Sequence, residues 1–534
     1  MRNTNLYLRC GALFGVLAST ATAYSAQKDR GGVVVGGKRY NVVYVMCDDL
    51  NDYEGVFGGH PQAKTPNIDR IAKSGVQFVN AYSNSPVSQP SRNSLFTGVH
   101  AVDSKDFGWT ARCDQPVLKN NKTIMRMFRE NGYTVYGTGK LLHNNEYSKE
   151  FDHYGLQSGI KWSITYGPFV AGVDANGEPT TTVHKDVPYP YNKIGAVDGS
   201  YGPMTSEQEW VYGWELGKLR YNSANDRDPL PDEMQAAWAV EQLQDMSKRQ
   251  GDDPFFLGVG FCRPHTPLHV PAKYYDMFPI DELELANWLP NDEADTYFAK
   301  YREQLKKGFI YYEQLLKSYG GDRELAIKSF LQGYLACVTF ADEQIGKVWD
   351  ALQESPYKDN TIFVLTSDHG WQMGEKSYLF KESLWDESTH IPLLVCHPDA
   401  VDASQVEQAV SLVDIFPTLV DMCGLEGDNR LNADGAELSG HSMLPLLNGQ
   451  EWRGPNGAVS IVGGVGTKSS IFEQHLSYRT KDWRYIRYRN GSEELYDHQK
   501  DPNEWTNIAN DRAYKAIKKQ LKEELCDVIG VQLR

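Results

Sequence analysis

The sequence is short of three things: cysteine, long apolar runs and net positive charge. Of its 534 residues only 8 are cysteine, and an odd, sparse set beyond the N-terminal segment excludes a disulfide scaffold. No stretch approaches the ~20 apolar residues of a membrane span, so we expect no membrane insertion. With 54 basic against 70 acidic residues the net charge is −16, which argues against nucleic acid as a partner, because phosphate binding needs a basic surface. An anionic substrate stays possible, since local charge in a cleft can oppose the global sign.

The first 26 residues are predicted to be an export signal. Arg2 and Arg9 supply the positive start, residues 10–21 form a short apolar and small-residue run, and residues 21–23 and 24–26 are alternative cleavage sites. That run is too short to span a bilayer. We therefore expect an exported protein, periplasmic or secreted.

Apolar runs alternate with helical patterns, which favours an α/β fold with a mostly parallel central sheet. The buried strands are expected at residues 40–46, 133–136, 255–261, 361–365 and 391–395, and the main helices at residues 66–73, 123–131 and 333–352. Residues 157–232 are rich in Gly, Pro, Tyr and Asn and form a candidate wall of a substrate cleft. Near Gly449 the pattern changes, so we expect a main domain over residues 27–450 and a small C-terminal α+β subdomain over residues 451–534.

Polar side chains follow four of the expected strands. They are Asp48 and Asp49, Lys140 and His143, His265, and Asp368 and His369. One Asp pair after a strand is more often a turn than a ligand pair. Four such clusters indicate a shared site, because ligands of open α/β sheets bind beyond the carboxyl ends of the strands.

The chemistry of these residues favours an anionic substrate. Asp48, Asp49 and Asp368 offer hard oxygen ligands that suit Ca²⁺ or Mg²⁺, although turn and N-cap roles are the alternative interpretation. Lysines, an arginine and histidines stand around the carboxylates in this grouping. A metal ion and these cations together suit a tetrahedral oxyanion.

Residues 88–98, SQPSRNSLFTG, resemble the maturation motif of the sulfatases, in which Cys or Ser followed by x-Pro-x-Arg is oxidised to formylglycine. Alone, this segment is only a Ser-rich loop opening a helix. However, TPNIDRIAKSGVQFVNAY (residues 65–82), SDHGWQMGE (residues 367–375) and ELYDHQKDPNEWTNIAND (residues 494–511) stand in the matching order around it. Nearly the whole mature chain thus resembles the type-I sulfatases. The resemblance implies an alkaline-phosphatase-like sandwich, with residues 27–450 as the catalytic domain.

Within that family the chain is similar to iduronate-2-sulfatase and to bacterial polysaccharide sulfatases. The similarity rests on GKLLH (residues 139–143), RPHTP (residues 263–267) and SDHGW (residues 367–371). It implies one calcium ion as cofactor, with these ligands: Asp48, Asp49, the modified Ser88, Asp368 and His369.

The resemblance also implies roles for the remaining polar residues. Arg92 and Lys140 would hold oxygens of the hydrated formylglycine and of sulfate, and His143 would be the base that helps expel sulfate. Lys381 and His265 would bind sulfate on the far side, with His265 as the acid for the departing alcohol; Lys376 is an alternative to Lys381. Weaker candidates for the substrate wall are Arg263, Trp371 and His390, and for Trp371 a buried packing role is equally expected.

Ser88 stands where the motif more often has Cys. A serine implies a bacterial, serine-type sulfatase that depends on a separate maturation enzyme as its partner. The formylglycine hydrate explains the need for maturation, because one of its hydroxyls attacks sulfur and deprotonation of the other expels sulfate.

The predicted function is a sulfuric ester hydrolase that removes sulfate from a sulfated sugar of a polysaccharide or its oligosaccharides. Two alternatives stay open. One is a phosphonate or phosphodiester hydrolase of the same superfamily. The other is a non-catalytic protein that binds sulfated glycans, if Ser88 is unmodified.

Overall fold

The computed structural model describes residues 39–143, 147–155, 166–170, 172–173, 179–180, 200–212, 218–247, 253–301, 306–399, 404–463 and 470–533. The predicted export signal lies outside these residues, and the segment 157–232 is described only in part. Residues from Arg39 onward cluster as one unit. The division at residue 450 stays a prediction.

Within the described residues the central sheet has eight strands, in the order β19-β2-β18-β14-β1-β13-β4-β5. Their bounds are β1 Asn41–Asp48, β2 Val76–Phe78, β4 Thr134–Gly139, β5 His153–Tyr154, β13 Phe255–Pro264, β14 Thr361–Ser367, β18 Leu393–Cys396 and β19 Ser404–Val406. Five neighbouring pairs are parallel, and only β18 pairs antiparallel with its two neighbours. The prediction of a mostly parallel sheet is confirmed.

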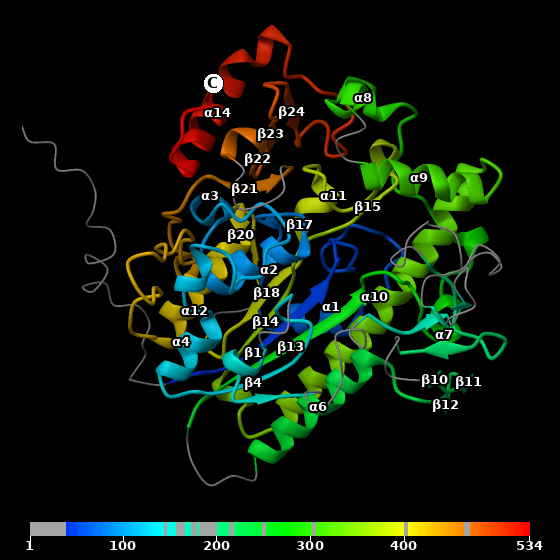
Figure 1. Ribbon diagram of the computed structural model, residues 1–534, viewed down its shortest axis with the longest axis vertical. Helices are drawn as coiled ribbons and strands as arrows, with labels where there is room; N and C mark the ends of the chain where they lie inside the picture. Colours follow the sequence, from blue (N-terminus) through cyan, green and yellow to red (C-terminus); the bar gives the residue numbers. More distant parts are fainter. Residues whose placement is uncertain are drawn as a thin grey trace, which may run out of the picture. The chain divides into compact units, whose positions relative to one another are not determined.

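The sheet is covered by helices on both faces (Figure 1). Every residue of β1 is buried, and its side chains alternate: Val43 and Val45 join one apolar cluster, whereas Val42 and Tyr44 join another. The first cluster includes the helices α1 (Pro66–Ala72), α6 (Pro231–Met246) and α10 (Arg323–Glu354). The second includes α2 (Ser88–Thr97), α4 (Ile124–Glu130) and α12 (Ile415–Cys423). Burial on two faces explains why these strands are continuous apolar runs.

Local signals explain where the helices begin. Pro66 opens α1, as expected of proline at a first helical position, and the Thr123 side chain accepts a hydrogen bond from the Arg126 amide at the start of α4. The helix α10 begins ten residues earlier than residue 333 because the Asp322 side chain caps it, accepting from the Leu325 amide.

The C-terminal part carries the expected antiparallel sheet. Its strands are β21 (Gly457–Val462), β22 (His475–Thr480), β23 (Trp483–Arg487) and β24 (Glu493–Asp497), paired in that order. The helix α14 (Lys515–Ile529) packs on it through Leu521 and Leu525.

Short elements connect these layers. The helices are α3 Ala101–Ser104, α5 Tyr147–Glu150, α7 Ala272–Tyr275, α8 Phe298–Tyr301, α9 Lys306–Ser318, α11 Asp386–Thr389 and α13 Leu444–Leu447. The strands are β3 Ala81–Tyr82, β6 Phe169–Val170, β7 Gly172–Val173, β8 Pro179–Thr180, β9 Trp210–Val211, β10 Lys218–Leu219, β11 Tyr221–Ser223, β12 Asp226–Arg227, β15 Gln372–Met373, β16 Leu379–Phe380, β17 His390–Ile391 and β20 Val410–Ser411.

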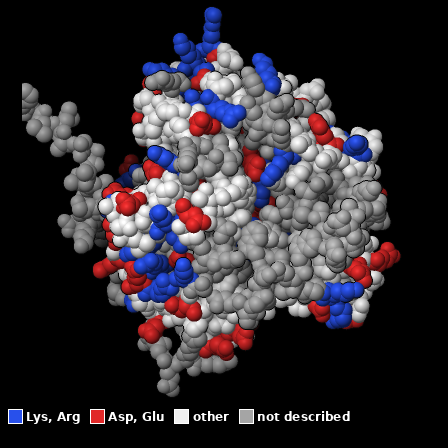
Figure 2. Space-filling model, viewed as in Figure 1, with Lys and Arg blue, Asp and Glu red and all other residues white. Residues whose placement is uncertain are grey.

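Among the described residues, none of the helices has the length and apolar character needed to cross a bilayer. On the face drawn in Figure 2, Lys and Arg are interspersed with Asp and Glu rather than gathered into one basic surface.

Candidate active site

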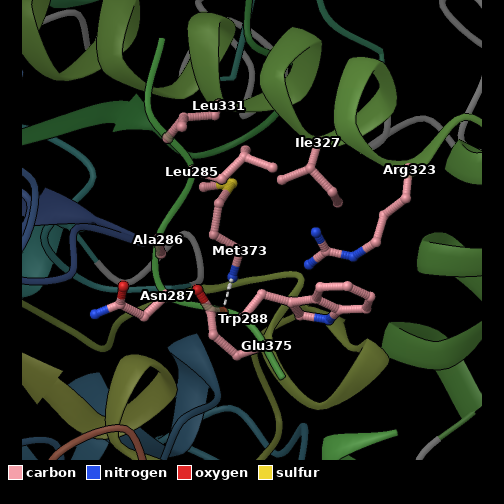
Figure 3. Close-up of a pocket in the computed structure, with 9 residues that line it drawn as sticks. All are labelled: Leu285, Ala286, Asn287, Trp288, Arg323, Ile327, Leu331, Met373 and Glu375. Carbon is pink, nitrogen blue, oxygen red and sulfur yellow. Dashed lines mark hydrogen bonds between the residues drawn. The ribbon is translucent and has the colours of Figure 1, made fainter. Parts of the chain in front are cut away.

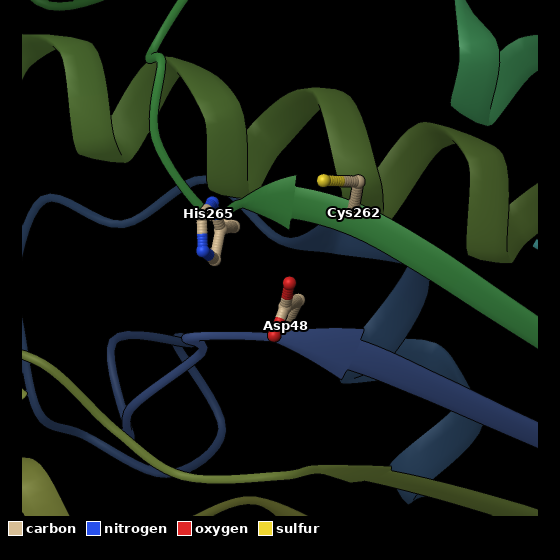
Figure 4. A group of neighbouring side chains, drawn as sticks. All are labelled: Asp48, Cys262 and His265. Carbon is tan, nitrogen blue, oxygen red and sulfur yellow. The ribbon is translucent and has the colours of Figure 1, made fainter. Parts of the chain in front are cut away.

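The carboxyl ends of four central strands meet at one cluster of polar side chains. Asp48 ends β1, Lys140 follows β4, His265 follows β13 and Asp368 follows β14. Lys140 forms an ion pair with Asp48, and His265 Nε2 lies 3.8 Å from Asp49 Oδ2. Figure 4 shows Asp48 and His265 facing each other at the ends of β1 and β13. The structure therefore brings polar residues from these strand ends together in one place.

Two glycines let the strand ends approach closely enough to place Lys140. Gly139 has a φ of 72°, and a Cβ atom there would lie 1.9 Å from the Gly260 carbonyl oxygen. A Cβ on Gly260 would meet the Lys140 backbone at 2.3 Å. Because neither position has a side chain, the Lys140 amide donates to the Gly260 carbonyl at 2.9 Å, and the lysine turns toward Asp48.

Ser88 is the first residue of α2 and is 1% exposed. Its Oγ donates to Asp48 Oδ1 at 3.3 Å and lies 2.9 Å from His369 Nε2. Lys381 Nζ donates to Ser88 Oγ at 3.4 Å. An oxygen at residue 88 therefore stands among a carboxylate, an imidazole and an ammonium group, at a helix N-terminus that favours negative charge.

Arg92 lies one turn further along α2 and is completely buried. Its Nη2 pairs with Asp48 Oδ1 at 3.1 Å and its Nε with Asp368 Oδ2 at 3.0 Å. The remaining guanidinium nitrogen, Nη1, donates to the carbonyls of Lys140 and Leu141. These contacts make Arg92 a clamp on two candidate metal ligands, a function that the motif alone does not reveal.

Four residues offer ligand atoms that all lie within 4.8 Å of one another: Asp48, Asp49, Asp368 and His369. Asp49 Oδ2 is buried and has no hydrogen-bond partner. Asp49 also has a φ of 64°, an uncommon conformation for a residue with a side chain that is found at functional sites. The buried, unpartnered oxygen and the hard oxygen donors fit a divalent cation.

His369 is oriented as a metal-binding histidine would be. Its Nδ1 lies 3.1 Å from the Gly370 carbonyl, so that this nitrogen donates and Nε2 is left as the acceptor facing Ser88. Burial lowers the pKa of His369 to about 4, so the ring is neutral near pH 7.

The carboxylates are held at very different proton affinities. Burial alone would raise the pKa of Asp48, but Lys140, His265 and Arg92 together hold it well below its usual range. Burial raises the pKa of Asp49 to about 8 against the effect of Lys381, with Asp48 acting in the same direction as burial. A divalent cation among these groups would favour the ionised carboxylates and so oppose the burial that raises the pKa of Asp49.

The two lysines of the segment GEKSYLFKES (residues 374–383) have separate partners. Lys381 Nζ lies 2.6 Å from Asp49 Oδ1, and its pKa is raised because Asp49 and Asp48 outweigh the effect of burial. Lys376 Nζ instead pairs with Asp292 at 2.9 Å and donates to the Glu504 carbonyl. The structure therefore places Lys381, and not Lys376, beside Ser88.

His265 and His143 differ in their surroundings. His265 is 7% exposed, its Nδ1 bonds the Thr266 carbonyl, and burial followed by Lys381 holds its pKa well below the usual range. Burial also lowers the pKa of His143 to about 2, with Lys140 and Arg92 adding to the effect. Both rings are therefore neutral at pH 7 before substrate binds. A neutral ring can accept a proton, as the base function expected of His143 requires, whereas His265 must gain a proton before it acts as an acid.

The three wall candidates have other contacts. Arg263 is 2% exposed, and its guanidinium donates to the carbonyls of Tyr166, Gly167 and His265. Trp371 is 2% exposed and packs between Phe330 and Phe380. This geometry favours the packing alternative for Trp371, and substrate contact by either residue stays a prediction.

His390, the third candidate, stacks on Tyr82 and bonds the Val79 carbonyl at 2.9 Å. Its Nδ1 lies 3.5 Å from Asp52 and from Asp386. Contact between His390 and substrate likewise stays a prediction.

Two residues near the cluster were not among the candidate site residues of the sequence analysis. The Tyr166 ring lies 4.4 Å below Lys140 Nζ and 4.9 Å from the His265 ring, held there by the Arg263 clamp on its carbonyl. Cys262 is a buried thiol whose sulfur lies within 4.8 Å of ligand atoms of Asp48 and His265 (Figure 4). Tyr166 falls in a segment without periodicity, so only its place inside the expected wall was a signal.

Comparison with known proteins assigns this site to a family. The sulfatase family matches residues 40–425, and the C-terminal region of N-sulphoglucosamine sulphohydrolase matches residues 374–530. A sulfatase of Formosa agariphila is 30% identical over 488 residues, covering 90% of this chain and 85% of that protein. Iduronate 2-sulfatase of Mus musculus is 27% identical over 414 residues, covering 72% and 69%.

Solved structures show the same fold. A phosphonate monoester hydrolase of Agrobacterium radiobacter superposes with a TM-score of 0.66 at 24% identity, covering 93% of this chain and 96% of that one. A 2-O GAG sulfatase gives 0.64 at 22%, covering 92% of both chains. A protein in complex with its substrate D-glucosamine-2-N,6-O-disulfate gives 0.64 at 20%, covering 92% and 98%.

These likenesses show that the chain has the alkaline-phosphatase-like α/β fold that was expected from the sequence. The chain belongs to the sulfatase family and is a sulfuric ester hydrolase. The family resemblance drawn from the motifs, including the one to iduronate 2-sulfatase, is thereby confirmed.

Proposed function

We propose that this sulfatase removes sulfate from a sulfated sugar of a polysaccharide or its oligosaccharides, using a formylglycine made from Ser88. The observation that carries the proposal is the position of Ser88 Oγ, buried between Asp48, His369 and Lys381. Relatives named for glycosaminoglycan and glucosamine sulfates support a sugar as substrate.

An unmodified Ser88 explains binding but not turnover. A serine hydroxyl is a weak nucleophile, and covalent catalysis also needs a route by which the enzyme is regenerated. A separate serine-type maturation enzyme would remove two electrons and two protons from the Ser88 hydroxymethyl group and pass them to an acceptor of its own. The hydrated aldehyde supplies one hydroxyl to attack sulfur and a second hydroxyl whose deprotonation releases sulfate.

One Ca²⁺ would be held by Asp48, Asp49, Asp368, His369 and residue 88. Its charge would polarise the sulfate group. The formal charges of Asp48, Asp49 and Asp368 are balanced by three cations, Arg92, Lys140 and Lys381. A divalent cation therefore makes the cluster net positive, which favours a sulfate monoester.

The chain's own residues then divide the work. Lys381 points its ammonium group toward residue 88, and Lys140 pairs with Asp48 beside it. Both lysines bind sulfate oxygens, while Arg92 fixes the ligand carboxylates. Negative charge from the bound ester raises the proton affinity of His265, which delivers a proton from Nε2 to the departing alcohol oxygen. The neutral His143 accepts the proton that is lost when sulfate is released.

The cellular setting is part of the same proposal. Export by the N-terminal signal, to the periplasm or the medium, would bring the enzyme to polymeric sulfated sugars or their fragments. The bacterial origin and the serine-type maturation partner follow from serine, rather than cysteine, at position 88.

Mass spectrometry tests the proposal directly. In active protein the tryptic peptide over residues 74–92 should be lighter by one pair of hydrogens, in proportion to specific activity. Ser88→Ala should abolish turnover and keep the fold. High turnover from wholly unmodified Ser88 refutes the formylglycine mechanism.

A parallel assay distinguishes the open alternatives. Faster hydrolysis of phosphonate monoesters than of sulfated sugars would favour the alternative hydrolase. Glycan binding without turnover by unmodified protein would favour a binding protein.

A further inference from the structure

Trp109 is the most exposed large hydrophobic side chain among the described residues, at 47%. A single exposed apolar residue needs no explanation, but this one has a particular neighbour. Its ring centroid lies 5.2 Å from that of His143, with the planes inclined at 54°. An open indole face therefore stands at the edge of the catalytic cluster.

The loop that carries Trp109 is fixed to the catalytic helix. Asn93 follows Arg92 in α2 and is 4% exposed. Its Nδ2 donates to Asp106 Oδ2 at 2.8 Å and to the Thr110 carbonyl at 3.1 Å. Both acceptors flank Trp109 in the chain, so one buried amide holds the loop on each side of the ring.

A second exposed tryptophan offers a contrast. Trp288 is 38% exposed, and the Arg323 guanidinium lies 3.8 Å from the centre of its ring. It lines a pocket formed with Ile327 and Met373, and none of the candidate catalytic residues lines that pocket (Figure 3). One face of this indole is already covered by a cation.

Resting on the proposed function, we propose that Trp109 is the platform on which the sugar ring carrying the sulfate stacks. The C–H faces of a pyranose are apolar and pack on an indole, and an exposed, rigidly held Trp gives large contact area at little entropic cost. Because the ring contacts His143 and the Lys140–His143 segment enters the cluster, a sugar on Trp109 directs its sulfate toward Lys140 and residue 88. Trp109 therefore determines specificity for carbohydrate esters over small sulfate esters.

The test compares Trp109→Ala, Trp109→Phe and the matched control Trp288→Ala in matured enzyme. The probes are a 2-O-sulfated heparin disaccharide, D-glucosamine-2-N,6-O-disulfate and an iota-carrageenan oligosaccharide, with inorganic sulfate as an inhibitor that has no ring. For the best substrate of the three, Trp109→Ala should raise KM about tenfold or more, and Trp109→Phe should recover most of the loss. The inhibition constant of sulfate and the KM of Trp288→Ala should stay within about twofold of wild type.

The outcomes separate this inference from the proposed function. If a sulfated sugar is hydrolysed and Trp109→Ala leaves its KM unchanged, the stacking platform is wrong and the sulfatase proposal stands. An equal rise in the inhibition constant of sulfate would also overturn the platform, because it would show damage to the sulfate pocket. If the wild-type enzyme neither binds nor hydrolyses any of the three sugars, the sugar substrate is wrong and the platform falls with it.

Discussion

Lys381→Met tests which lysine of the GEKSYLFKES segment serves the reaction. Lys381 is 4% exposed, and its Nζ lies 2.6 Å from Asp49 Oδ1 and 3.4 Å from Ser88 Oγ. A preorganised donor of this kind, aimed at developing charge, is worth about 100-fold to 1,000-fold in kcat. We therefore expect kcat of Lys381→Met to fall by that factor, while the far-ultraviolet circular dichroism of the folded protein is unchanged.

Lys376→Met is the matched control, because Lys376 is an equally buried lysine of the same segment. Its loss leaves Asp292 buried without its cation partner, which costs about 3–5 kcal/mol of unfolding free energy. For a chain of 534 residues this lowers Tm by about 3–5 °C.

The folded fraction of Lys376→Met should keep wild-type kcat, since Lys376 touches none of the candidate catalytic residues. Steady-state kinetics and thermal melts of both variants decide the matter. If Lys381→Met keeps kcat within about threefold of wild type, or if folded Lys376→Met loses kcat to the same degree, the assignment of Lys381 is wrong.

Three further predictions concern the metal, the histidines and pH. Exhaustive chelation should reduce activity, and calcium should restore it better than zinc, because the donors are mainly carboxylates. Asp368→Ala should lower the metal content found by elemental analysis. Full activity of metal-free protein would contradict the ligand set. His265→Ala should slow hydrolysis of a sulfated sugar more than that of an activated aryl sulfate, and equal losses would leave His265 only a binding role; His143→Ala should instead accumulate sulfate on residue 88, detectable by mass spectrometry. Burial lowers the pKa of His269 to about 3, below the ~6.5 of an unfolded chain, so the unfolded state takes up the proton first and stability is lost as the pH falls. Between about pH 6.5 and 5 this loss of unfolding free energy is about 2 kcal/mol, or about 2 °C in Tm. His269→Gln should lack this contribution to the pH dependence of stability. An unchanged pH dependence in that variant would contradict the buried neutral ring.

The position of the candidate site was predictable because the rule behind it concerns the backbone. Parallel strands bring their carboxyl ends to one edge, so Asp48, Lys140, His265 and Asp368 converge whatever their side chains do. The same reasoning could not reveal that β18 runs antiparallel, because a buried apolar run reads the same in either direction.

Side-chain partners were less predictable, because they depend on atoms brought together from distant segments. Arg92 was expected to hold sulfate oxygens, yet its donors meet Asp48, Asp368 and two carbonyls. Arg263 was a candidate for the substrate wall, and its donors instead meet carbonyls that position Tyr166. In each case a charged residue in a motif has a neighbour that the motif does not contain.

The balance of charges in the cluster has a consequence for every substitution in it. Asp48 is shared by Arg92 and Lys140, and Asp49 faces both Lys381 and His265. Removing any one of these groups therefore changes the proton affinity of its neighbours as well as its own contact with substrate. The losses of activity measured for single substitutions will not be additive in such a network, since each substitution also changes the groups around the substituted residue. Double-mutant cycles, begun with the directly paired Lys381 and Asp49, separate a residue's own contact with sulfate from its effect on the ligand carboxylates.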